Sequence, residues 1–179
     1  MEEQVQILDK TFVRSISEQE IAEAVTRIAV QISDNLREKD PIFIVVLNGA
    51  FMFASDLMKE LNFPSRITFV KMASYEKTAS TGVVKELIGL SEDIEGRTVV
   101  VIEDIVDTGY TMQCMMAALR SHHPEEIHIA SLFMKPENLK VDLHVDYVAF
   151  HIPNDFIVGY GLDYEGYGRN LSAIYSVVE

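Results

Sequence analysis

The sequence is poor in cysteine and has no long apolar run. A single cysteine, Cys114, among 179 residues excludes an intramolecular disulfide framework and is typical of a reducing compartment. No apolar run approaches the roughly 20 residues that a membrane-spanning helix needs. The acidic N-terminal segment MEEQVQILDK also lacks the apolar core of a secretory signal. These absences predict a soluble, cytoplasmic protein without a membrane partner.

Positive charge is also scarce. Lysine and arginine number 15 against 28 acidic residues, which gives a formal net charge of -13. A protein that holds a nucleic-acid backbone over a broad surface usually carries a basic patch. The cations here are thinly scattered, so we expect no nucleic-acid partner. A small anionic ligand is still compatible, because a few local cations, backbone amides and a divalent metal can form its pocket.

The chain does contain alternating helical and strand patterns. Residues 17–20, SEQE, match a capping box, and the helical apolar stripe behind them ends at Asp40-Pro41. Further helices are expected at about 51–61 and 111–119. Apolar runs predict strands at 42–47, 67–72, 98–102, 127–134 and 145–150, and residues 83–89 could form a returning strand.

This alternation predicts an α/β fold, with a central, mostly parallel sheet and helices on both faces. The last thirty residues are rich in glycine and resemble loop more than a structural layer. We expect a single domain over residues 1–179, with a core at about 15–150. The terminal segments, about 1–14 and 151–179, would add a small hood or flap.

The most informative segment is VVVIEDIVDTGYT, residues 99–111. A buried strand brings Glu103 and Asp104 to its C-terminal end, which is where ligands of open α/β sheets bind. Their hard oxygen donors suit magnesium or ribose hydroxyls. Residues 107–111 then lead through a glycine into a helix, whose first amides lack internal partners. This segment can therefore cradle a phosphate.

Acids and a glycine turn at a strand end are common in doubly wound proteins, including response regulators and Walker-type nucleotide-binding proteins. In this chain, however, there is no GxxxxGK[ST] phosphate loop, and the candidate phosphate segment follows the acids directly. The combination favours a functional site over an ordinary strand-to-helix turn.

Residues 99–111 resemble the phosphoribosyl-pyrophosphate signature of the type I phosphoribosyltransferases, and the rest of the chain resembles the hypoxanthine-guanine branch. The resemblance implies the fold of that family and transfer of the phosphoribosyl group from phosphoribosyl pyrophosphate to a 6-oxopurine base. Hypoxanthine or guanine would give IMP or GMP and pyrophosphate, with Mg2+ as cofactor. It also implies a homo-oligomer, either a dimer or a tetramer.

The resemblance also assigns roles on the phosphoribose side. Glu103 and Asp104 would hold the ribose hydroxyls and the magnesium's water shell, and Asp107 would be the general base beside N7 of the purine. The 5-phosphate would contact Asp107, Thr108, Gly109, Tyr110 and Thr111. Tyr110 stands where many relatives have lysine or another polar residue.

The segment LNGA, residues 47–50, resembles the pyrophosphate-binding turn of the family. Asn48 and Gly49 would bind pyrophosphate there, together with Arg169, whose planar fork suits phosphate oxygens. The family has a non-proline cis peptide at the position of Leu47-Asn48.

On the base side, the resemblance assigns Lys135 as donor to the purine O6. It assigns Phe156 to stack on the base, Ile157 to offer its backbone to the base edge, and Asp163 to bind a second magnesium. Ser74 and Tyr75 would belong to the loop that closes over the reaction centre. Without the resemblance, a lysine after a strand is usually solvated and an aromatic beside aliphatic residues is usually core.

Three other functions remain open. One is a nucleic-acid-binding regulator on the same fold, which would need a basic face or an added domain. Another is a phosphoribosyltransferase for xanthine, adenine or a pyrimidine; against adenine, Lys135 has only donors and would meet the amino group unpaired. The third is a magnesium-dependent binding protein without catalysis, against which Asp107 argues.

Overall fold

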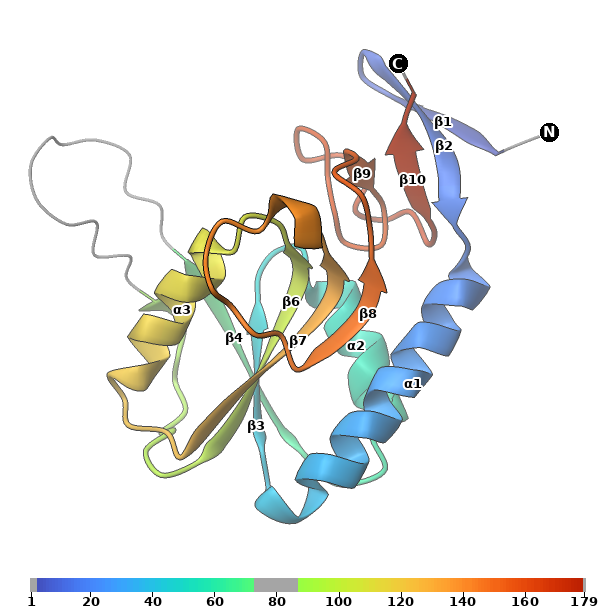
Figure 1. Cartoon of the computed structure of the whole chain (residues 1–179). Helices are drawn as coiled ribbons and strands as arrows, with labels where there is room; N and C mark the ends of the chain where they lie inside the picture. The colour runs from blue at the N-terminus through green and yellow to red at the C-terminus, as the bar shows by residue number, and fades with distance from the viewer. Residues whose placement is uncertain (1–2, 73–86, 179) are drawn as a thin grey trace, which may run out of the picture.

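The computed structural model describes residues 3–72 and 87–178, in two sheets and the helices that pack on them (Figure 1). The larger sheet has the strand order β5-β4-β3-β6-β7-β8. Every neighbouring pair is parallel except β4 with β5. The strands are β3 (Ile42–Val46), β4 (Arg66–Met72), β5 (Leu87–Ile88), β6 (Thr98–Val106), β7 (Glu126–Met134) and β8 (Tyr147–His151). The expected parallel sheet is confirmed.

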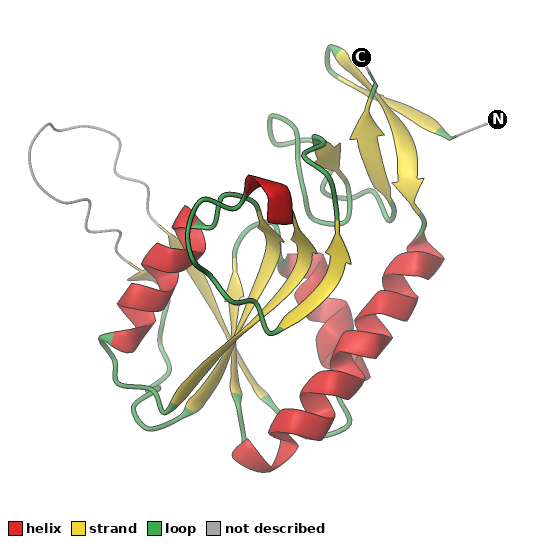
Figure 2. Cartoon of the chain, in the orientation of Figure 1, coloured by secondary structure: helices red, strands yellow, loops and turns green. Residues whose placement is uncertain are grey.

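The helices cover both faces of this sheet, as expected (Figure 2). On one face lie α1 (Glu18–Leu36) and α2 (Phe51–Glu60), and on the other lies α3 (Tyr110–Arg120). Short 3-10 turns follow α1 and β7, namely η1 (Arg37–Lys39) and η2 (Pro136–Asn138). The predicted capping box is present, because Ser17 accepts from the amide of Glu20 and the Glu20 side chain accepts from the amide of Ser17.

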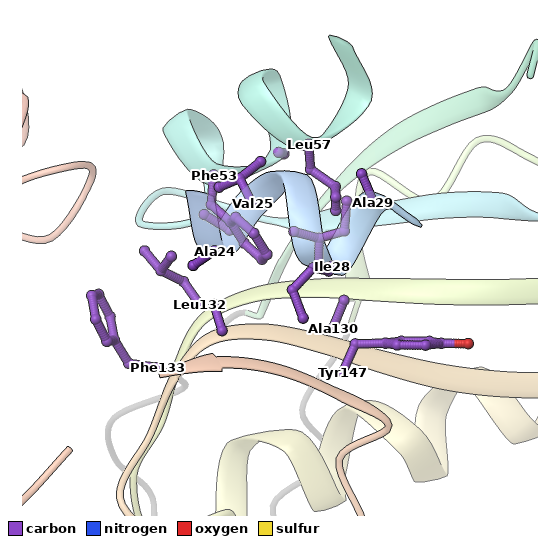
Figure 3. Packing of buried hydrophobic residues seen from close by; sticks show 14 of the residues in the cluster. Ala24, Val25, Ile28, Ala29, Phe53, Leu57, Ala130, Leu132, Phe133 and Tyr147 are labelled. Atoms are coloured by element: carbon purple, nitrogen blue, oxygen red, sulfur yellow. The ribbon is translucent and has the colours of Figure 1, made fainter. Parts of the chain in front are cut away.

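Alternate residues of the central strands supply the two cores. Ile28 of α1 and Phe53 and Leu57 of α2 pack against Ala130 and Leu132 of β7 (Figure 3). The opposite side chains of the strands pack against methionines of α3. Val99 to Ile102 of β6 are fully buried, as a β-branched run covered on both faces should be. Each such side chain contributes about 1.5–3 kcal/mol through burial, which fixes the sheet that carries the candidate site.

The terminal segments contribute the strands of a second sheet. Its order is β1-β2-β10-β9, all antiparallel, with β1 (Gln4–Ile7), β2 (Lys10–Ile16), β9 (Ile157–Val158) and β10 (Ile174–Val177). Phe12, Val158 and Tyr175 belong to its own small core. The last thirty residues are still mostly loop, as expected, because among residues 152–178 only β9 and β10, six residues in all, are strands. The pairing of β10 with the N-terminal strand β2 was not predicted. The glycines there adopt left-handed turns between very short strands, so the sequence lacks a periodic run.

Two boundaries bear on the candidate site. Strand β6 continues past the predicted end at 102 as far as Val106, and Glu103 pairs with Ser131 of β7. Both acids therefore lie within the C-terminal part of the strand itself. Residues 87–88 of the proposed returning strand form β5, whereas 83–86 lie outside the described residues. Ser74 and Tyr75 of the expected closing loop also lie outside them.

Candidate active site

Two cavities open at the carboxyl end of β6, and they share one wall. One has a volume of about 220 Å³ and the other about 230 Å³. Asp104, Ile105 and Asp107 line both. The first cavity is otherwise lined by Glu103 and the segment leading into α3, and the second by residues from the end of β7 and from the hood. The arrangement can hold two chemical groups on either side of Asp104 and Asp107.

The predicted phosphate segment forms the floor of the first cavity. Gly109 is the N-cap of α3 and has φ 84°, a left-handed conformation that favours glycine. Because its cap offers no side-chain acceptor, the first amides of α3 are available to an anion. Thr108 and Thr111 line the cavity. Tyr110 does not, and its side chain is 53% exposed.

The two adjacent carboxylates differ in environment. Glu103 is only 7% exposed, and this burial, together with the negative charge of Asp104, raises the pKa of the Glu103 carboxyl well above its usual range. Asp104 is half-buried, and its Oδ1 accepts from the amide of Ile105 at 2.8 Å. Of the two acids, Asp104 lines both cavities, whereas Glu103 lines the first.

The turn after β3 packs directly onto this pair. The Leu47-Asn48 peptide is cis, as the resemblance implied. Gly49 is buried against Asp104, and Gly161 of the hood packs on the carbonyl oxygen of Gly49. Asn48 is exposed. The predicted pyrophosphate turn therefore lies beside the acids and beneath the hood.

Lys135 is buried, contrary to what a lysine after a strand normally does. Its side chain is 9% exposed, and Nζ lies 3.1 Å from Asp107 Oδ2 and 3.4 Å from Asn154 Oδ1. Its amide donates to the carbonyl of Val106 at 2.9 Å, which fixes the end of β7 beside the phosphate segment. A buried ammonium needs such a partner, so the lysine and the Asp107 carboxylate hold each other in the wall of the second cavity.

Hood residues form the far side of the second cavity. Phe156 is 45% exposed, and its ring meets that of Tyr164 edge-on at 5.7 Å between centroids. Ile157 is buried beside it. Asp163 also lines the cavity, and its Oδ2 accepts from the amide of Gly166 at 2.7 Å.

Arg169 lines neither cavity. Its guanidinium forms an ion pair with Asp163 Oδ1, and it donates to the carbonyl of Gly161 at 2.6 Å. Gly161 belongs to the hood turn that lies on the Gly49 turn, so Arg169 is joined to that turn through Gly161. The structure thus connects Arg169 to the predicted site through two neighbours rather than directly.

Sequence reasoning missed three polar residues of this site. Asn138 donates to Asp107, Asn154 lies against Lys135, and Asp155 lines the second cavity. The only local signal was the proline after Lys135, which is typical of a turn that could bring Asn138 back towards Asp107. The other contacts join segments far apart in the chain.

The donors at the site fit magnesium shared with a ligand. Among the residues that the structure describes, no three His, Cys, Asp or Glu side chains are grouped so that they could hold a metal by themselves. Mg2+ is commonly bound by one or two carboxylates together with substrate phosphates and water. Glu103 and Asp104 beside a phosphate-binding segment match that pattern. None of the described helices is long and apolar enough to cross a membrane.

Comparison with known proteins assigns the chain to a family. A model described as the phosphoribosyl transferase domain matches residues 13–165. The hypoxanthine-guanine phosphoribosyltransferase of Mycobacterium avium is 37% identical over 166 residues, which are 89% of this chain and 82% of that protein. The enzyme of the same name from Streptococcus pyogenes serotype M3 is 40% identical over 156 residues, 87% of each chain.

Solved structures agree. A crystal structure of a hypoxanthine-guanine phosphoribosyltransferase from Bacillus anthracis matches with a TM-score of 0.82 at 37% identity, over 93% of this chain and 96% of that one. The hypoxanthine phosphoribosyltransferase of Trypanosoma cruzi matches with a TM-score of 0.83 at 31% identity, over 92% and 95%. This chain belongs to the phosphoribosyltransferase family.

Proposed function

We propose that this chain transfers the phosphoribosyl group from phosphoribosyl pyrophosphate to hypoxanthine or guanine, forming IMP or GMP and releasing pyrophosphate. The observation that carries the proposal is the pair of Lys135 Nζ and Asp107 Oδ2, 3.1 Å apart in the wall of the second cavity. A 6-oxopurine presents O6 and N7 side by side on one edge. An ammonium and a carboxylate side by side are complementary to a carbonyl oxygen and a neighbouring N7–H.

The first cavity takes the phosphoribose. The amides and hydroxyls of residues 108–111 bind the 5-phosphate, with Tyr110 contributing through its backbone rather than its exposed ring. Glu103 and Asp104 hold the ribose hydroxyls and the water shell of Mg2+. When bound, the magnesium neutralises charge on the pyrophosphate. The turn of Asn48 and Gly49 lies beside these acids and binds the pyrophosphate itself.

The hood completes the base site and supplies the remaining contacts. Phe156 stacks on the purine, and Ile157 offers backbone groups to its edge. Asp163 is the candidate ligand of a second magnesium. That ion would compete for the Asp163 carboxylate with its present partners, Arg169 and the amide of Gly166. Arg169 binds pyrophosphate once it exchanges that ion pair for phosphate oxygens.

In the chemical step, N9 of the purine bonds to C1 of the ribose while the bond from C1 to the pyrophosphate oxygen breaks. The pyrophosphate leaves with the electron pair, and the proton on N7 passes to the carboxylate of Asp107. General-base catalysis of this kind is typically worth about 10²–10⁴-fold. Lys135 donates to O6 and, having no acceptor, leaves the amino group of adenine unpaired.

A screen of five bases tests this function directly. Hypoxanthine, guanine, xanthine, adenine and uracil are each offered with phosphoribosyl pyrophosphate and magnesium, and product is followed by absorbance. We expect turnover of hypoxanthine or guanine, and none once the metal is chelated until magnesium is restored. Adenine turnover within about tenfold of hypoxanthine contradicts the 6-oxopurine assignment, because a site built on a specific hydrogen bond discriminates by roughly 10⁴-fold.

We also propose that the protein is a cytoplasmic homo-oligomer, a dimer or a tetramer, without a nucleic-acid partner. The net charge of -13 supports the last point, since it leaves little basic surface for a phosphate backbone. Light scattering coupled to gel filtration measures the oligomeric state. Filter binding of RNA at low salt tests for a regulator on the same fold, and salt-sensitive retention there would contradict the proposal.

A further inference from the structure

Asp107 has a second protein partner that none of the roles above uses. Its Oδ2 faces Lys135, whereas its Oδ1 accepts a hydrogen bond from Nδ2 of Asn138. Each oxygen of the carboxylate therefore has its own donor, and the two donors come from opposite ends of one short segment. The Asn138 side chain is partly buried, so solvent replaces it poorly.

The turn η2 brings Asn138 to this position. Pro136 is the first residue of the turn, and its fixed φ favours the tight path that the chain takes after β7. The amide of Asn138 donates to the carbonyl of Lys135 at 3.1 Å, which closes the turn. Both donors to the Asp107 carboxylate are thus set by one closed turn of the chain.

The segment after the turn packs behind the phosphate segment. The amide of Lys140 donates to the carbonyl of Thr108 at 3.0 Å. A Cβ on Gly109 would lie 2.6 Å from Val141 Cγ2 and 2.8 Å from Leu139 Cδ1, so these side chains fill the space beneath the glycine. Backbone contacts of the neighbouring residues therefore fix the position of Asn138 relative to Asp107, in addition to the hydrogen bond of its side-chain amide.

We propose that Asn138 is a positioning residue, which holds Asp107 Oδ1 so that Oδ2 faces the N7 proton of the bound base. The inference rests on the proposed role of Asp107 as proton acceptor. A carboxylate turns readily about its last side-chain bond, because that torsion is broad. Lys135 cannot fix the orientation alone, since it must also donate to O6 of the base. The Asn138 amide contacts neither substrate and acts only through Asp107.

The test is a double-mutant cycle in the full-length protein. Asn138→Ala, Asp107→Asn and the double variant are compared in single turnovers, with enzyme in excess over hypoxanthine at saturating phosphoribosyl pyrophosphate and magnesium. This rate reports the chemical step rather than product release. Asn62→Ala is the matched control, because the exposed Asn62 follows α2, accepts from Arg37 at 2.6 Å and lines neither cavity.

We expect Asn138→Ala to lower the single-turnover rate by about tenfold, a part of the ~10²–10⁴-fold typical of a general base. The dissociation constant of IMP should change less than about twofold. Adding Asn138→Ala to Asp107→Asn should cost no further rate, because residues that act as a unit are not additive. The Asn62→Ala protein should react like the unmodified one.

Three results would overturn the inference: a rate for Asn138→Ala within twofold of normal, a further tenfold loss in the double variant, or weaker IMP binding that accounts for the whole effect. If Asn138→Ala does not fold, Asn138→Leu keeps a similar size but offers no donor, and a normal rate for it is equally decisive. A normal rate for Asp107→Asn would instead remove the proposed base itself. A slow Asp107→Asn beside a normal Asn138→Ala would remove only the role of Asn138.

Discussion

Gly49 faces the carboxylate of Asp104 so closely that a Cβ on the glycine would lie 1.4 Å from Oδ2 and 2.4 Å from Cγ. The turn after β3 and the end of β6 therefore meet where only a hydrogen atom fits. On the other side of the turn, a Cβ on Gly161 would lie 2.0 Å from the carbonyl oxygen of Gly49. Any side chain at position 49 displaces Asp104 before it meets a ligand.

This contact predicts that Gly49→Ala is as damaging as a larger substitution. Displacing Asp104 disturbs the wall shared by both cavities, so we expect kcat/KM for phosphoribosyl pyrophosphate to fall by well over tenfold, about 1.4 kcal/mol or more. Asn48→Lys is the control. Because the side chain at position 48 is exposed, this change should alter the KM for phosphoribosyl pyrophosphate by less than about tenfold. Steady-state kinetics measures both. A near-normal Gly49→Ala enzyme would show that Asp104 and the turn are not coupled.

The raised pKa of Glu103 predicts how stability depends on pH. A buried acid whose pKa is raised by folding stabilises the fold below its unfolded pKa, and this stabilisation is lost as pH rises through the folded pKa. Glu103→Gln removes the titration. The melting temperature of this variant minus that of the unmodified protein should therefore grow from pH 4 to pH 9 without metal.

The exposed Glu95→Gln serves as control for this pH series and should show a constant difference. Magnesium with phosphoribosyl pyrophosphate should narrow the gap for Glu103→Gln, because the ligands favour the ionised acid in the unmodified protein only. If the difference in melting temperature between Glu103→Gln and the unmodified protein stays constant or shrinks with rising pH without metal, burial does not raise the pKa of Glu103.

The parts of the fold that could be predicted are those set by local pattern. The capping box at Ser17 and the β-branched run before Glu103 each depend on neighbours in sequence, and both are present. A hood from the terminal segments was expected, but its strand pairing could not be predicted, because β10 pairs with β2 across most of the chain, and β9 is two residues long. Pairing between distant short segments leaves no periodicity to detect.

The same distinction holds within the site. Resemblance to the family predicted the cis peptide between Leu47 and Asn48, which no composition or spacing suggests. It did not predict that Arg169 pairs with Asp163, or that Asn138 donates to Asp107. Such contacts depend on how the hood and η2 fold back on the sheet, and many sequences could satisfy the same local pattern without making them.

Lys135→Gln should narrow the discrimination between bases. A glutamine amide both donates and accepts, so it can satisfy the carbonyl of hypoxanthine or the amino group of adenine. We expect kcat/KM for hypoxanthine to fall and the ratio of hypoxanthine to adenine to drop well below the roughly 10⁴ of a specific site. The exposed Lys140→Gln is the matched control. If both variants keep the hypoxanthine-to-adenine ratio of the unmodified protein, Lys135 does not determine base specificity.

Tyr160→Phe tests how the hood is held to the α/β core. The buried Tyr160 hydroxyl donates to Asp56 Oδ2 of α2 at 2.5 Å, and burial followed by this bond raises the pKa of the tyrosine. A hydrogen bond to a charged group contributes about 1.5–3 kcal/mol. Asp56 keeps Lys59 as a partner, at 2.6 Å, so the loss should fall at the lower end of that range.

We therefore expect Tyr160→Phe to lower the melting temperature by several degrees and to speed amide exchange in β9 and β10 more than in β6. The reason is that the bond joins the hood to α2 and touches no strand of the larger sheet. Tyr167→Phe is the control, because the Tyr167 ring is 60% exposed. Equal acceleration in all three strands would mean that the molecule opens as a whole. The hood would then have no separate opening for Tyr160 to restrain, and the bond to Asp56 would act on global stability alone.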